Sequence, residues 1–192
     1  MRSDKNCYIS LLILMFGIFV FQQDVFGQKA LSVQDEKIKS EFEKEAKDYS
    51  NLRERLEDEL PKLPKEASAE QIENHKISFQ TSVRNARSDA KQGDIFNPSA
   101  AQLIRKIIKE EFQGKERVDL RKTVFEAETQ GVPIKINFSY PQSKEKVEMP
   151  PTLLLKLPQL PKQLRYRFVG QNLLLVDREN GLIIDFMTNA LP

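Results

Sequence analysis

The spacing of apolar residues changes once along this chain, at Gly131, and the change decides the fold class. Before it, apolar positions recur every three or four residues, which is the period of an amphipathic helix. After it, residues 132–140 alternate apolar with polar, which is the period of a strand with one buried face. The pattern predicts an α+β fold. About four helices over residues 28–130 precede a small antiparallel sheet over residues 131–192, made of one strand plus a three-stranded meander. Whether the two regions share one core is left open by the pattern.

Four helical segments are expected. The first carries a narrow apolar stripe over residues 38–60 and is ended by two prolines. The second begins at a capping box of Ser, Ala, Glu and Gln at 68–71. The third begins at an Asn-Pro pair at 97–98, which fits an N-cap followed by the first helical residue. A fourth covers about 116–128.

The last segment predicts two hairpins joined by two-residue turns. The Gly-Gln turn is expected to be type II′ and to pair Phe168 with Leu173. The Asn-Gly turn is expected to be type I′ and to pair Leu175 with Phe186. Paired residues share a face of the sheet, so these pairings predict a single apolar face. That face would carry Leu164, Tyr166, Phe168, Leu173, Leu175, Ile184 and Phe186.

Residues 1–27 have the layout of a secretory signal peptide. Arg2 and Lys5 precede an uncharged apolar run at 9–21, and small residues at positions −3 and −1 fit a cut between Gly27 and Gln28. A helix that spans a bilayer needs about 20 apolar residues, so this run is too short for one. We therefore expect an exported protein, periplasmic or extracellular, with no stable membrane span after processing. A retained anchor is the alternative.

The composition excludes most catalytic chemistry. His75 is the only histidine, and the only cysteine, Cys7, lies in the signal peptide, so a conventional zinc, nickel or cobalt site is not expected. No glycine-rich phosphate motif is present, and a net charge of +2 gives no case for a nucleic acid partner. We expect no metal, no cofactor and no catalytic residues. His75 lies on the apolar stripe of the second helix, where we expect it to be partly buried.

Two surfaces are candidates for contact with another protein. The second face of the meander mixes charged with apolar residues, and Arg165, Arg167 and Asp185 are its candidate contact residues. The alternative is that the helices cover part of this face and that its charges pair with one another. The first helix, at 31–60, has a narrow stripe and is expected to lie on the surface as an adaptable contact. Self-association through it as a short coiled coil is an alternative.

Several short motifs near the C-terminus resemble a module of bacterial secreted proteins: LPQLP at 157–161, YRFVG at 166–170, LLLVD at 173–177 and GLIID at 181–185. They are similar to the C-terminal part of RcnB-like periplasmic proteins, which are associated with nickel and cobalt homeostasis, and to the ending of CigR-like proteins. The longer stretch from about residue 63, with AKQGDIF at 90–96, resembles uncharacterised secreted proteins of acidobacterial type. The resemblance implies the hairpins and a location outside the cytoplasm.

These observations favour an exported protein without catalytic activity that acts through contacts with an unidentified protein of the cell envelope. Two alternatives stay open. The resemblance alone implies a periplasmic accessory of metal homeostasis. The abundance of acidic residues leaves room for a hydrolase of envelope glycans that uses two carboxyl groups.

Overall fold

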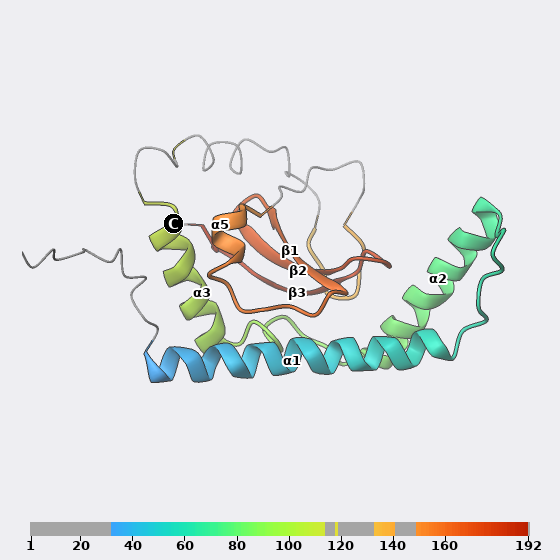
Figure 1. Ribbon diagram of the computed structural model, residues 1–192, viewed down its shortest axis with the longest axis horizontal. Helices are drawn as coiled ribbons and strands as arrows, with labels where there is room; N and C mark the ends of the chain where they lie inside the picture. Colours follow the sequence, from blue (N-terminus) through green and yellow to red (C-terminus); the bar gives the residue numbers. More distant parts are fainter. Residues whose placement is uncertain (1–31, 114–117, 119–132, 141–148, 192) are drawn as a thin grey trace, which may run out of the picture. The chain divides into compact units, whose positions relative to one another are not determined.

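The computed structural model describes residues 32–113, 118, 133–140 and 149–191 (Figure 1). Within them, four helices, three of them substantial, precede a three-stranded antiparallel sheet, so the α+β class is confirmed. The elements are α1 (Val33–Asp58), α2 (Ala69–Ala86), α3 (Pro98–Glu111), α5 (Pro151–Leu154), β1 (Leu164–Val169), β2 (Asn172–Asp177) and β3 (Ile183–Met187). The expected signal peptide and nearly all of the helix expected at 116–128 lie outside the described residues.

The helix starts follow the capping residues of the sequence. The Ser68 hydroxyl accepts a hydrogen bond from the backbone N–H of Gln71, and the Gln71 side chain accepts one from the backbone N–H of Ser68, which completes the capping box. The Asn97 side chain accepts from the N–H of Ala100 at 2.9 Å and begins α3 as expected. Ser32 caps α1 in the same way by accepting from Asp35.

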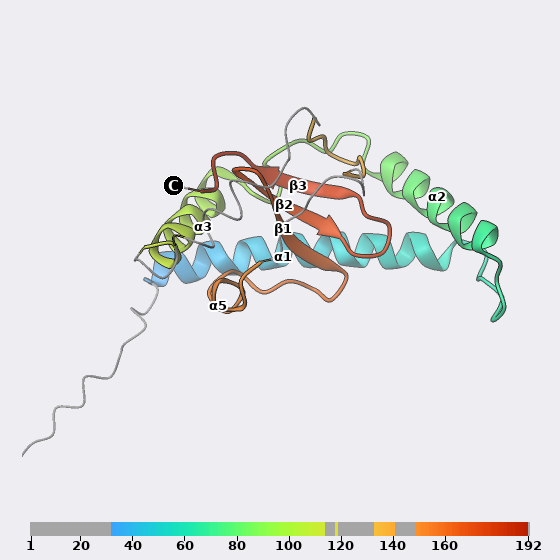
Figure 2. The same cartoon turned by 90° about the horizontal axis from the view of Figure 1, so that it is seen from above.

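The first helix is part of the core, which corrects the expectation of a surface helix. Phe42 and Ala46 are fully buried, and the Phe42 ring lies 5.3 Å from the ring of Phe96 and 6.3 Å from the ring of Tyr166. Figures 1 and 2 show α1 running beside the sheet, with α3 near one end and α2 near the other. Residues of α1, α3 and all three strands therefore belong to one apolar cluster.

The sheet has the strand order β1-β2-β3, and only its first hairpin has the expected register. Phe168 pairs with Leu173 as predicted, but Phe186 pairs with Leu174 instead of Leu175. This one-residue difference places Phe186 on the second face of the sheet and Met187 in the main core. The prediction of seven apolar residues on one face is therefore wrong for Phe186.

The longer loop of the second hairpin explains the changed register. The Asp177 carboxylate accepts hydrogen bonds from the backbone N–H groups of Glu179 and Asn180, and the backbone N–H of Asp177 donates to the carbonyl of Leu182 at 3.0 Å. Four residues, 178–181, thus form the loop. A type I′ turn at Asn180 and Gly181 would need a positive φ at both residues. Only Gly181 has one, 75°. A bulge opposite Leu175 and Val176 then shifts the rest of β3 by one residue.

The strand expected over residues 132–140 is not formed within the described part of it. Residues 133–140 make one isolated bridge, between Ser139 and Leu182, and Asn137 takes a positive φ of 61° that interrupts an extended strand. The segment still packs on the second face of the sheet. There Tyr140, with the partly buried Ile134, joins a second apolar cluster formed mainly by the strands. Among the described residues, no helix is long and apolar enough to cross a membrane.

Candidate functional site

A buried polar pair joins α1 to the sheet. The Tyr49 hydroxyl donates a 2.7 Å hydrogen bond to Oδ2 of Asp177, whose side chain is fully buried. Burial, and next the negative charge of Asp177, raise the pKa of Tyr49 far above its ordinary value. The phenol therefore stays protonated and keeps donating, so this pair has a structural role.

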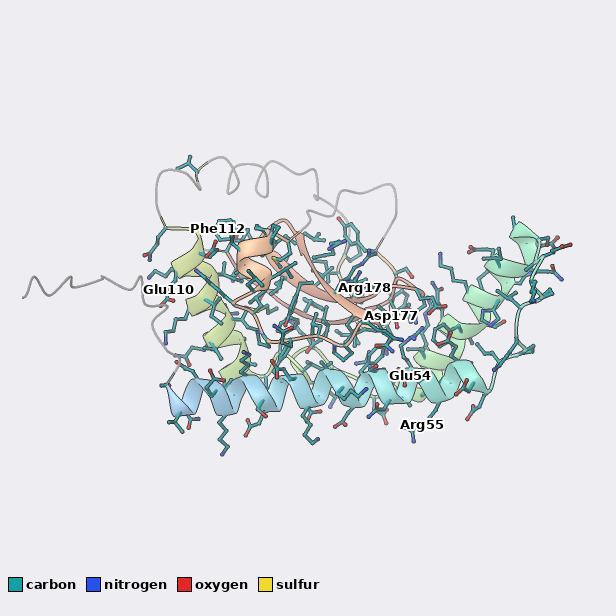
Figure 3. The ribbon with its side chains drawn as sticks, in the orientation of Figure 1. Glu54, Arg55, Glu110, Phe112, Asp177 and Arg178 are labelled. Atoms are coloured by element: carbon teal, nitrogen blue, oxygen red, sulfur yellow. The ribbon has the colours of Figure 1, made fainter. Side chains whose placement is uncertain are left out.

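Arg53 extends this pair into a charge network. Its Nε lies 3.0 Å from Oδ2 of Asp177, its Nη1 lies 3.2 Å from the Glu57 carboxylate, and its Nη2 donates to Glu179. Burial alone lowers the pKa of Arg53, but the three carboxylates outweigh it and raise the pKa. The guanidinium also lies over the Phe79 ring of α2, 4.8 Å from its centre. One buried cation thus connects α1, α2 and the second hairpin. Figure 3 shows the labelled Asp177 and Arg178 on the side of the sheet toward Glu54 of α1.

Asp185 holds the loop that connects α2 to α3. Its carboxylate accepts hydrogen bonds from the backbone N–H groups of Gly93, Ile95 and Phe96 at 2.7–2.9 Å, and from its neighbour Phe186 at 2.8 Å. Burial raises the pKa of Asp185, although these four bonds oppose the rise. Both oxygens of this buried carboxyl are occupied by backbone groups. Asp185 is thus a structural acceptor and not an acid poised for glycan cleavage.

Asn137 fixes the segment 133–140 against α2. Its side chain exchanges hydrogen bonds with Arg87, accepting from Nη1 at 2.9 Å and donating to the backbone carbonyl at 2.7 Å. Its own carbonyl accepts from Arg84, and its N–H donates to the carbonyl of Ile183. Together these bonds cover the outer edge of β3, so the two edges of the sheet differ.

The outer edge of β1 pairs with no other strand among the described residues, although Tyr166 and Phe168 are themselves buried. The backbone N–H of Arg178 donates to the carbonyl of Gln163, so these two residues form a hydrogen-bonded pair. Such pairs alternate along an antiparallel ladder, and the next residues of β1 whose backbone groups bond to β2 are therefore Arg165 and Arg167. The backbone groups of Tyr166 and Phe168 therefore point away from the sheet. The Tyr166 carbonyl accepts from the Arg167 side chain, while the described residues offer no partner to the N–H groups of Tyr166 and Phe168.

A groove of about 200 Å³ runs beside this edge, between β1 and the segment that precedes it; we call it the β1 groove. Its apolar lining includes Leu154, Pro158, Leu160 and Pro161, and its cationic lining consists of Lys162, Arg165, Arg167 and Arg178. Among the described residues, no carboxylate pairs with Lys162, Arg165 or Arg178. The β1 groove thus combines an edge that pairs with no described strand with three cations, Lys162, Arg165 and Arg178, that have no acidic partner among the described residues.

The three residues predicted as a contact surface separate in the structure. Arg165 and Arg167 are half-buried, lie on the second face of the sheet and line the β1 groove. Asp185 is fully buried on the core side, because the bulge in β3 turns it inward. Arg165 and Asp185 also lie in different rows of the sheet, since Val176 is flanked by Arg165 and Ile183.

The remaining predicted positions have simpler outcomes. His75 lies in α2 and is half-buried, as expected from its place on the helix. Gly27 and Gln28 lie outside the described residues, so the cleavage site stays a prediction. Within the described ranges, no group of three or more His, Cys, Asp or Glu side chains is placed to hold a metal ion.

Sequence reasoning missed Asp177, Arg53 and Arg178. The signal for Asp177 was present, because an aspartate three residues before the Asn of an Asn-Gly pair can accept backbone hydrogen bonds within its own turn. The signal for Arg53 was weaker: a charged residue on the apolar stripe of the first helix can indicate a buried ion pair. Nothing local marks Arg178, whose importance comes from the open edge beside it.

The described residues define an α+β protein whose sheet ends at β1, beside a groove with a basic lining. No family model matches the chain, and no curated protein or solved structure matches it. Function must therefore be argued from the groove itself.

Proposed function

We propose that this chain is an exported, non-catalytic binding protein of the cell envelope, which takes up an extended acidic segment of a partner protein along the edge of β1. The observation that carries the proposal is the β1 groove, where outward-pointing N–H groups lie beside cations without acidic partners. The signal-peptide layout of residues 1–27 supports the export part of the proposal.

The unpaired edge of β1 favours an extended partner. A segment that pairs with Tyr166 and Phe168 would add a fourth strand to the sheet and satisfy their N–H groups. Main-chain hydrogen bonds of this kind give affinity for many sequences, and the side-chain contacts then select among them.

The charges of the groove favour an acidic partner. Lys162 and Arg178 are exposed, Arg165 is half-buried, and none of them pairs with a carboxylate among the described residues. Carboxylates on the incoming segment would supply these pairs, and like charges on a wrong partner would be repelled. The apolar lining would accept the alternate side chains, since successive residues of a strand point to opposite faces.

A labelled decapeptide that alternates glutamate with valine or threonine tests the proposal. We expect it to bind the purified chain saturably in fluorescence anisotropy, and to bind more weakly as salt is raised. The same peptide with glutamine in place of glutamate should bind at least about tenfold more weakly, because the charge-assisted pairs are lost.

Charge reversal locates the site. Lys162→Glu should weaken peptide binding about tenfold, since an exposed cation of the groove becomes an anion facing an acidic ligand. The matched control is Lys65→Glu, which makes the same charge change in the exposed connector between α1 and α2. Equal effects of the two variants, or no peptide binding at all, would contradict the proposal.

A further inference from the structure

The side chain of Arg167 bends back onto the edge of its own strand. Its Nη1 donates a 3.0 Å hydrogen bond to the backbone carbonyl of Tyr166, and the side chain is half-buried beside the β1 groove. The Tyr166 carbonyl points away from β2, because Arg165 and Arg167 are the residues whose backbone groups bond to β2. The guanidinium therefore lies at the outer edge of β1, on an acceptor that an added strand would use.

This hydrogen bond competes with strand addition at Tyr166. An incoming antiparallel strand would exchange two hydrogen bonds with Tyr166, one to its carbonyl and one from its N–H. The N–H of that strand would approach the carbonyl oxygen to about 2.9 Å from outside the sheet. Arg167 already holds a donor at a similar distance from the same oxygen, so the guanidinium has to move before a strand can pair fully there.

The pairing geometry also brings one side chain of the incoming strand to Arg167. If Tyr166 and Phe168 form hydrogen-bonded pairs with the strand, the residue opposite Arg167 belongs to a non-hydrogen-bonded pair. The side chains of such a pair lie close together on the same face of the sheet. A carboxylate at this position would offer the guanidinium an ion pair, often bidentate, in place of one bond to a neutral carbonyl. A neutral side chain would offer a weaker replacement.

We infer that Arg167 is the residue that makes the β1 groove select acidic segments. In the free protein it covers the Tyr166 carbonyl, and on binding it exchanges that carbonyl for a carboxylate of the segment. The inference rests on the proposed function, because it concerns the selectivity of the same groove. It differs from simple charge attraction in one respect. Removal of Arg167 should help a neutral segment to bind, whereas removal of an ordinary cation should not.

Arg167→Ala and Arg165→Ala form a matched pair of variants. Both remove a half-buried arginine that lines the β1 groove, and of the two it is Arg167 that is bonded to the Tyr166 carbonyl. In fluorescence anisotropy, Arg167→Ala should bind the glutamate decapeptide about threefold more weakly and the glutamine decapeptide about threefold more tightly, so that the two bind almost equally. Arg165→Ala should weaken binding of the glutamate peptide and leave binding of the glutamine peptide at the wild-type level.

Arg167→Met keeps the apolar length of the side chain without its donors, and it repeats the test if the alanine variant does not fold. Wild-type discrimination between the two peptides in the Arg167 variants would overturn the inference and leave the proposed function standing. Weaker glutamate binding without a gain in glutamine binding would also overturn it, because Arg167 would then act only as a charge. If the wild-type chain binds neither peptide, the proposed function fails and the inference fails with it.

Discussion

Tyr49 and Asp177 are 128 residues apart in the chain, and the hydroxyl of the first donates a 2.7 Å hydrogen bond to the buried carboxylate of the second. The bond ties the middle of α1 to the end of β2. Because Arg53 and two backbone N–H groups share the same carboxylate, Asp177 organises both the helix contact and the second hairpin. That hairpin in turn carries Arg178, which lines the β1 groove.

Tyr49→Phe should lower the free energy of unfolding by about 1–2 kcal/mol, because the carboxylate loses one donor in a buried setting. Urea denaturation of the variant and the wild type measures the change. Lys44→Gln serves as the control, since it breaks only exposed pairs, with Glu45 and Asp48, and should leave the unfolding midpoint where it is. Equal midpoints for all three proteins would show that the buried bond contributes nothing.

Phe42→Ala should destabilise the protein by about 3–5 kcal/mol, since a fully buried ring against Phe96 and Tyr166 is lost. Deleting residues 31–60 should likewise abolish cooperative melting. Val33→Ala is the control in the same helix, at a side chain 90% exposed, and should change the melting temperature little. If the deletion variant folds and melts cooperatively, α1 is not needed for the core, and the prediction is contradicted.

Gly181→Ala should cost about 1 kcal/mol, because a φ of 75° strains a residue that has a Cβ. Steric contact is not the cause, since the nearest atom to an added Cβ is Oγ of Ser139 at 4.0 Å. Gly181→Asn should cost less, because asparagine tolerates this conformation. Thermal unfolding of the two variants separates backbone strain from side-chain size. Equal losses of stability in the two variants would argue against backbone strain.

The Asp185 carboxyl should titrate above its ordinary pKa of 3.8, since burial outweighs its four hydrogen bonds. The folded state then binds this proton more readily than the unfolded state. Its contribution to stability is therefore full below pH 3.8 and is lost as pH rises through the pKa of the folded state. A ¹³C NMR titration of the side-chain carboxyl measures the shift, and a midpoint at or below 3.8 would contradict it.

Local patterns predicted the parts of this fold that local interactions determine. The capping residues Ser68 and Asn97 begin helices where expected, and the two-residue turn after β1 gives the correct first hairpin. The second hairpin was wrong because the Asp177 side chain stabilises a four-residue loop, and the bulge in β3 then reverses the facing of each later residue.

Long-range contacts account for the rest. Asp185 seemed to belong to a surface because its partners are backbone N–H groups about 90 residues away, which no side-chain pattern reveals. The stripe on α1 appeared too narrow for a core helix, since Arg53 widens the buried face as a paired cation and not as an apolar residue. Of the cations that line the β1 groove, Arg165 and Arg167 were named from sequence as contact residues, which stays a prediction, while Lys162 and Arg178 became candidates only with the position of the groove.

The central claim is that the edge of β1 receives an extended acidic segment, and amide hydrogen exchange tests it most directly. The account predicts that the N–H groups of Tyr166 and Phe168 exchange more slowly when the glutamate-containing decapeptide is added. The N–H of Arg167, already bonded to β2, should change little. Unaltered exchange at Tyr166 and Phe168 under saturating peptide would contradict the account, because strand addition would place both N–H groups in hydrogen bonds with the peptide.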